Sequence, residues 1–151
     1  MLKSYEQAYG EIVIKKNEQS NLHNDLDSEE ISKFAPLAQK WWEPSGPFQA
    51  LHAINIPRIK YIRDNLCHSF EIDSHKNKPL SGISMLDVGC GGGLTAEPMA
   101  KLGAKITAID AEENTIKAAQ FHAQKSQLSI DYRHEKIENF LTSTERFNCV
   151  I

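Results

Sequence analysis

The chain has 151 residues, of which 40% are hydrophobic and 25% charged, as in an ordinary globular protein large enough to bury one core. Its formal charge of −3 argues against a protein that grips a nucleic-acid backbone with a basic face. Three cysteines without CxxC spacing argue against a disulfide framework or a structural zinc site, and no apolar run approaches the roughly 20 residues that span a bilayer.

The N-terminal segment is polar, and residues 1–28 are predicted to form a mobile arm. Its lysines are balanced by glutamates, and the first arginine of the chain is Arg58, so the arm lacks the pattern of a secretory signal or a mitochondrial transit peptide. Asp27 or Ser28 is expected to cap a helix that begins at Glu29 and is interrupted or kinked by Pro36.

Residues 29–80 are predicted to form a helical cap that precedes the main domain. A turn is expected at residues 44–47, with the sequence Pro-Ser-Gly-Pro, and a second helix from about Pro57 to Leu66. The polar residues 68–81 are predicted to be a loop between the cap and the following domain.

Residues 81–151 alternate between short apolar runs and amphipathic stretches, which predicts a parallel, doubly wound α/β sheet. The expected strands are residues 83–88, 104–109, a run around residues 130–132, and 147 onward, and the expected helices are 94–102, 112–125 and 137–141. Because the last run reads as a strand just beginning, we expect a sheet that is incomplete at the C-terminus and a truncated sequence.

A glycine-rich loop, Asp87-Val-Gly-Cys-Gly-Gly-Gly93, lies between the first expected strand and helix. Leu94 breaks the G-x-G-x-x-G dinucleotide fingerprint, whereas Gly89, Gly91 and Gly93 complete G-x-G-x-G. This version, with Asp87 beside it, suits a cofactor without a pyrophosphate but with an ammonium-bearing tail, such as S-adenosylmethionine. The glycines alone also fit a tight turn without a ligand.

Asp110 ends the second expected strand, where a carboxylate can accept hydrogen bonds from both hydroxyls of a ribose. This feature supports nucleoside binding but does not choose between the two cofactor classes. The alternative for Asp110 is a cap of the next helix.

The stretch from Asp87 to Asp110 resembles motif I, with its sequel, of class I S-adenosylmethionine-dependent methyltransferases. A second pattern upstream is similar to that of the ubiquinone-biosynthesis O-methyltransferases. It reads W-W-[DE]-x-x-G-x-[FY]-x-x-L-H-x-x-N-x-x-R, carried here by Trp41, Trp42, Glu43, Gly46, Phe48, Leu51, His52, Asn55 and Arg58. Residues 62–66 and 78–83 look more like the mitochondrial members than the bacterial ones.

The resemblance implies a Rossmann-like methyltransferase sheet with an N-terminal helical cap, and an enzyme that methylates hydroxyl groups of polyprenyl catechol-type intermediates. It also implies that Arg58, Gly89 and Asp110 contact S-adenosylmethionine, and the loop chemistry adds Asp87 and Gly91. Arg58 is expected to meet the cofactor carboxylate, because a guanidinium fork suits it. No residue is assigned as catalytic, and His52 is expected to be a structural hydrogen-bonder rather than a base.

Two residues depart from the family pattern: Asn148 stands where an aspartate is common, and Pro98 is expected to remove one hydrogen bond early in its helix. The resemblance implies that Mg²⁺ is a cofactor open to the full-length family, through an acidic, histidine-bearing segment that this sequence is expected to lack, so no metal ligands are predicted here. His122 and His134 are expected to be surface residues. Trp41 and Trp42 either wall the pocket or fill the core under the cap, and at least one of them is expected in the core.

The implied partners are a polyprenylated aromatic lipid, a membrane surface and other proteins of the ubiquinone pathway, with no nucleic acid. The implied location is the matrix side of the mitochondrial inner membrane, or alternatively the bacterial cytoplasm. Two other functions stay open: a different small-molecule methyltransferase, and a truncated fragment that is catalytically incompetent. A nicotinamide dehydrogenase is disfavoured by Leu94.

Overall fold

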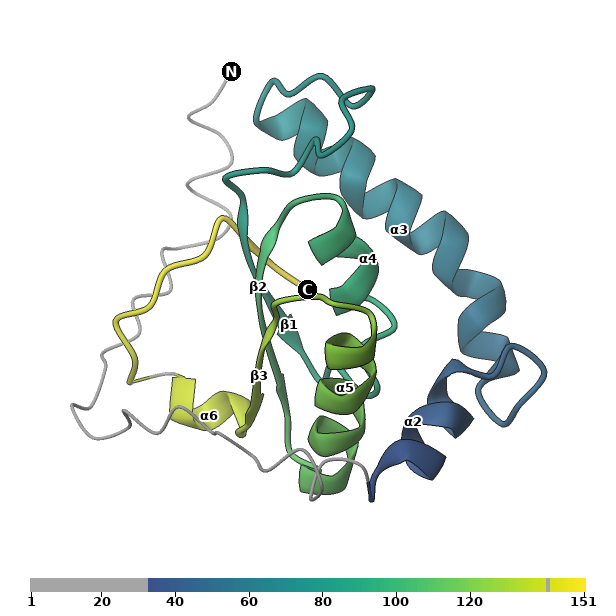
Figure 1. Ribbon diagram of the computed structural model, residues 1–151. Helices are drawn as coiled ribbons and strands as arrows, with labels where there is room; N and C mark the ends of the chain where they lie inside the picture. Colours follow the sequence, from purple (N-terminus) through teal and green to yellow (C-terminus); the bar gives the residue numbers. More distant parts are fainter. Residues whose placement is uncertain (1–32, 141) are drawn as a thin grey trace.

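The computed structural model describes residues 33–140 and 142–151, so the predicted mobile arm lies outside the described residues. A four-stranded parallel sheet forms its centre, in the order β3-β2-β1-β4 (Figure 1). The strands are β1 (Ser84–Val88), β2 (Lys105–Asp110), β3 (Asp131–His134) and β4 (Cys149–Val150). The parallel α/β sheet predicted from the alternating pattern is confirmed.

Helices cover both faces of this sheet (Figure 1). They are α2 (Ala35–Trp42), α3 (Gln49–Ser69), α4 (Ala96–Lys101), α5 (Glu113–Lys125) and α6 (Ile137–Phe140). Along β1, Met85 belongs to the core shared with α3, α4 and α5, whereas Leu86 belongs to a smaller core with Phe140 of α6. This alternation follows from the two-residue period of a strand with both faces buried.

The first described helix differs from the prediction. Lys33 and Phe34 form a turn, and α2 begins at Ala35 rather than at Glu29. Pro36 therefore lies in the first turn of the helix and does not kink it, because the amide that proline lacks has no helical partner there. Residues 29–32, which carry the rest of the predicted helix, lie outside the described residues.

The second helix is longer than predicted. It begins at Gln49, directly after the predicted turn, and encloses Pro57 instead of beginning there. Pro57 cannot donate to the carbonyl of Ala53, but both residues lie on the exposed side of α3, where water can serve that carbonyl. Within the described residues, no helix has the length and apolar character needed to cross a bilayer.

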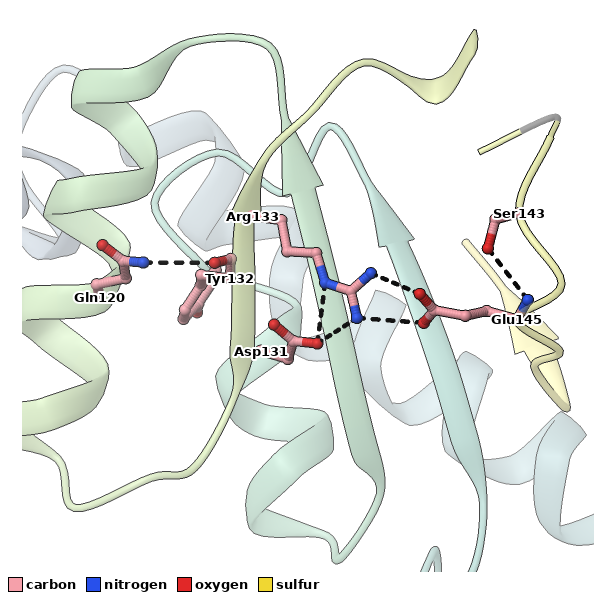
Figure 2. Close-up of polar contacts among 6 residues, drawn as sticks. All are labelled: Gln120, Asp131, Tyr132, Arg133, Ser143 and Glu145. Atoms are coloured by element: carbon pink, nitrogen blue, oxygen red, sulfur yellow. Dashed lines mark hydrogen bonds and ion pairs between the residues drawn. The ribbon is translucent and has the colours of Figure 1, made fainter. Parts of the chain in front are cut away.

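The connection between α6 and β4 is fastened to the sheet by one arginine (Figure 2). Arg133 of β3 pairs with Asp131 on the same strand and donates to both carboxylate oxygens of Glu145, at 2.8 and 3.1 Å. Its guanidinium also lies over the ring of Phe140. These contacts hold residues 142–148 near the sheet, so that β4 can pair with β1.

Asn148 joins the start of β4 to the start of β1. Its side-chain Oδ1 accepts hydrogen bonds from the backbone N–H and the hydroxyl of Ser84, both at 2.9 Å. The residue therefore has a structural role in the sheet.

Candidate functional site

The glycine loop follows β1 at the point where the direction of strand order reverses. From β1 the chain winds outward through β2 and β3, and then returns to place β4 on the other side of β1. Open parallel sheets bind ligands beyond the carboxyl ends of their strands at such a switch point. Gly89 and Gly91 have positive φ values of 69° and 53°, which ordinary L-residues adopt only at a cost.

A cavity of about 330 Å³ opens at this loop. Arg58 of α3, Asp87 of β1, and Gly89 and Gly91 of the loop all line it, so four of the five predicted cofactor residues meet there. A wider hollow of about 600 Å³ lies between α2 and α5 and contains none of the predicted site residues.

Asp87 brings a buried carboxyl group to the cavity. The residue is only 6% exposed, and its Oδ2 atom has no hydrogen-bond partner. Burial raises the pKa of Asp87, the charge of Arg58 opposes the shift, and the charge of Asp110 adds to it, so that the resulting pKa is about 6. An ammonium group placed beside Asp87 would favour its ionised form.

Arg58 approaches the cavity from α3. Its Nη2 donates to Oδ1 of Asn55 at 2.8 Å, while its Nε is buried without a partner. The guanidinium thus retains N–H donors for an anionic group of a ligand. The Asp87 carboxylate could not bind such a group, because it carries the same charge and only accepts hydrogen bonds.

Asp110 is the one predicted cofactor residue that does not line the cavity, although it touches a residue that does. Its Oδ2 accepts from the N–H of Gly91 at 3.0 Å, and its Oδ1 accepts from the N–H of Glu112 at 2.9 Å. The cap of α5 is Glu112, so the capping alternative for Asp110 is wrong. Each Asp110 oxygen has lone pairs left to accept from hydroxyls.

The double tryptophan packs on the glycine loop. A Cβ on Gly91 would lie 2.7 Å from Cη2 of Trp41, and a Cβ on Gly92 would lie 2.4 Å from Cγ of the same ring. Trp42 donates from Nε1 to the Gly92 carbonyl at 2.9 Å. Neither tryptophan is fully buried, so the expectation of a core tryptophan is wrong: α2 uses both rings to cover the loop.

His122 corrects the prediction of a surface histidine. Its Nδ1 lies 2.6 Å from Oε1 of Glu97, a fully buried carboxyl group of α4, and its ring stacks on Trp42 with centroids 3.9 Å apart. Burial raises the pKa of Glu97, and the hydrogen bond from His122 opposes the shift. His134 is exposed, with Nε2 lying 3.1 Å from the Ala111 carbonyl.

Sequence reasoning assigned no role to Asn55, Glu97 or Tyr132. The hydroxyl of Tyr132 lies so close to Gly93 that a Cβ there would be 2.2 Å from it, which explains the third glycine of the loop. His52 places Nε2 2.8 Å from the Trp41 carbonyl, in keeping with the expected structural role. Among residues 33–140 and 142–151, no cluster of three His, Cys, Asp or Glu is placed to hold a metal ion.

The comparisons with known proteins bear on the fold. Residues 85–151 match the family described as "Methyltransferase domain". The plantazolicin methyltransferase BpumL, solved with S-adenosylhomocysteine (SAH), aligns with 81% of this chain and 48% of its own, with a TM-score of 0.51 and 21% identity. The chain therefore has the fold of the class I S-adenosylmethionine-dependent methyltransferases.

Within that class, the sequence relatives are more specific. The ubiquinone biosynthesis O-methyltransferase of Pelagibacter ubique is 44% identical over 128 residues, which are 85% of this chain and 52% of the relative. That of Chelativorans sp. is 44% identical over 126 residues, 83% of this chain and 50% of the relative. Over the matched stretch the chain is similar to the ubiquinone biosynthesis O-methyltransferases, and it spans about half the length of the curated relatives it matches.

Proposed function

We propose that this chain binds S-adenosylmethionine at the cavity beside the glycine loop. One observation carries the proposal: Arg58 and Asp87 line one cavity from different elements, and each has a buried polar atom without a partner. A guanidinium and a carboxyl group form a complementary pair for the carboxylate and ammonium of an amino-acid tail.

The remaining predicted residues extend the site. The positive φ values of Gly89 and Gly91 favour glycine, and a Cβ on Gly89 would meet no atom within 4 Å, so a ligand can approach the backbone there. Asp110, anchored on the Gly91 N–H, would receive the two ribose hydroxyls. Asp87, Gly89, Gly91, Asp110 and Arg58 are thus the residues that would hold the cofactor.

We infer further that the protein transfers the cofactor's methyl group to a phenolic oxygen of a polyprenylated aromatic lipid. This extension rests on the names of the relatives, and the chain aligns with about half of the length of each. The bound cofactor supplies an electrophilic methyl group on a sulfonium. The residues of this chain would fix the cofactor in place, and alignment supplies much of the rate of such transfers.

Because the proposed substrate is a lipid, we expect the protein to act at a membrane surface. Other proteins of the same pathway are its proposed partners, and no nucleic acid is proposed as a partner. The relatives named above are bacterial, in line with the bacterial cytoplasm as the location. The mitochondrial alternative rests on residues 62–66 and 78–83 alone.

Calorimetric titration with S-adenosylmethionine tests the proposed site. Asp110→Ala is expected to weaken binding by about 100-fold, because it removes a charged acceptor of two hydrogen bonds. Asp110→Asn keeps an acceptor for the Gly91 N–H, so its affinity should lie between those of the wild type and Asp110→Ala. Asp73→Ala, which removes an exposed carboxylate bonded to the His75 N–H, is the matched control and should bind as the wild type does.

Circular dichroism of each variant separates lost binding from lost folding. Equal affinity of the folded wild type and Asp110→Ala would contradict the ribose role. Absence of binding by the folded wild type would contradict the proposed site as a whole.

A further inference from the structure

Asn55 makes two hydrogen bonds that connect the glycine loop to the cofactor cavity. Its Nδ2 donates to the carbonyl of Leu94 at 2.7 Å, and its Oδ1 accepts from Nη2 of Arg58 at 2.8 Å. Leu94 directly follows the loop, and both Leu94 and Arg58 line the cavity. One side chain of α3 therefore reaches the loop on one side and the cavity arginine on the other.

Pro98 explains why the Leu94 carbonyl is available. In an α-helix the N–H of residue 98 would donate to the carbonyl of residue 94, but proline has no N–H. Although Leu94 precedes α4, the helical pattern extends to it: Glu97 donates to the Gly93 carbonyl at 3.0 Å and Met99 to the Thr95 carbonyl at 3.2 Å, so only the bond between them is missing. The Asn55 amide thus occupies the place of the missing helical donor.

The chemistry of the two partners also fixes how the Asn55 amide is turned. A carbonyl accepts and a guanidinium only donates, so the NH₂ group must face Leu94 and the oxygen must face Arg58. The opposite orientation would set oxygen against oxygen and donor against donor. The hydrogen bond from the Asn55 Nδ2 to the Leu94 carbonyl therefore keeps the Asn55 Oδ1 turned toward Arg58.

We propose that Asn55 is a positioning residue: the Leu94 carbonyl left free by Pro98 holds its amide, and the amide holds the Arg58 guanidinium toward the carboxylate of the cofactor tail. This inference rests on the proposed function, in which Arg58 binds that carboxylate. With Nη2 engaged by Asn55 and Nε unpaired, the guanidinium enters the cavity in one orientation with its remaining donors free. Less rotamer freedom is then lost when the cofactor binds.

Two ligands that differ in the tail test the inference. SAH carries the carboxylate, and 5′-methylthioadenosine shares its nucleoside but lacks the amino-acid tail. Asn55→Ala is expected to lower SAH affinity about tenfold and to leave methylthioadenosine affinity unchanged. Arg58→Ala should show the same selectivity, and the double variant should be no weaker than Arg58→Ala, because both residues act through one contact.

Asn65→Ala is the matched control. Its side-chain amide lies on the same helix and donates to the Tyr61 carbonyl at 2.8 Å, on the exposed side. This variant should bind both ligands as the wild type does. A purely structural role for Asn55 would weaken both ligands equally and would overturn the proposal.

A second set of variants tests the link to Pro98 and guards against unfolding. Pro98→Ala restores a helical N–H for the Leu94 carbonyl, so the drop in melting temperature caused by Asn55→Ala should be about halved in that background. The Asn55→Ala/Pro98→Ala protein should still lose SAH affinity selectively, relative to Pro98→Ala. Strictly additive melting shifts would overturn the role of Pro98.

The outcomes separate this inference from the proposed function. If Arg58→Ala loses SAH selectively and Asn55→Ala does not, the positioning role is wrong and the cofactor site stands. If neither the wild type nor Arg58→Ala distinguishes the two ligands, the role of Arg58 is wrong and the inference falls with it.

Discussion

At the residue scale, Gly89 and Gly91 share a left-handed backbone but not an environment. A Cβ on Gly89 would meet no atom within 4 Å, whereas a Cβ on Gly91 would lie 2.7 Å from the Trp41 ring. The motif alone presents them as equivalent members of G-x-G-x-G. Only the position of α2 over the loop distinguishes them.

We therefore expect Gly91→Ala to destabilise the protein more than Gly89→Ala. Gly89→Ala should cost about 1–2 kcal/mol from its backbone conformation alone. Gly91→Ala adds the collision with Trp41 and should cost about 3–4 kcal/mol in total. Urea unfolding of the two variants measures the difference, and equal costs would mean that Trp41 moves away freely.

At the element scale, Glu97, His122 and Trp42 join α4, α5 and α2 behind the glycine loop. The carboxyl of Glu97 is fully buried, its Oε1 meets His122, and the His122 ring carries the Trp42 ring. Trp42 in turn donates to the Gly92 carbonyl. The loop is thus supported from the side of α5 as well as from α3.

His122→Ala should destabilise the protein by about 3 kcal/mol, because it leaves the Glu97 carboxyl buried without its partner. Adding Glu97→Gln should recover part of that loss, since an uncharged amide is less costly to bury. His134→Ala, which alters an exposed histidine, is the control and should change the free energy of unfolding by less than about 0.5 kcal/mol. Equal losses for the two histidine variants would contradict the support role.

The presence of the helices was predicted better than the residues at which they begin, and the prolines show why. Pro36, Pro57 and Pro98 were expected to kink, begin and weaken their helices, respectively. Pro36 instead lies in a first turn, Pro57 in a helix interior with its freed carbonyl exposed, and Pro98 beside an amide from another helix. A sequence shows that a proline lacks a backbone N–H, but it does not show which group donates to the freed carbonyl instead.

At the scale of the whole molecule, the buried Asp87 sets a pH dependence on folding. Its pKa in the folded protein is about 6, above the ordinary 3.8, so the native state holds this proton more tightly than the unfolded state does. The free energy of unfolding contributed by this group therefore falls as the pH rises from about 4 to about 6, by roughly 2–3 kcal/mol.

Asp87→Asn should remove this dependence. The difference in unfolding free energy between the variant and the wild type, measured by urea at a series of pH values, is expected to grow in favour of the variant up to about pH 6 and then level off. A difference that stays flat across this range would show that folding does not raise the pKa of Asp87.

The pH dependence of cofactor affinity should be opposite in sign to that of stability. A cationic ammonium favours ionised Asp87, so affinity for S-adenosylmethionine is expected to rise between about pH 5 and 7 with release of a proton. In Asp87→Asn, binding should be weaker and nearly independent of pH in this range. Calorimetry in buffers of different ionisation enthalpy counts the proton released. The stability lost by burying Asp87 is thus tied to the group that would bind the ammonium.

The parallel α/β sheet, the glycine loop and the places of Asp87 and Asp110 beside it could be predicted from the sequence, because they depend on local periodicity and on residues adjacent in the chain. Three features depend on how distant elements pack: Arg58 and Asp87 line one cavity, Asn55 donates to the carbonyl that Pro98 leaves free, and His122 lies against a buried carboxyl. Each of those features joins elements distant in sequence, and packing selects among partners that no local pattern ranks.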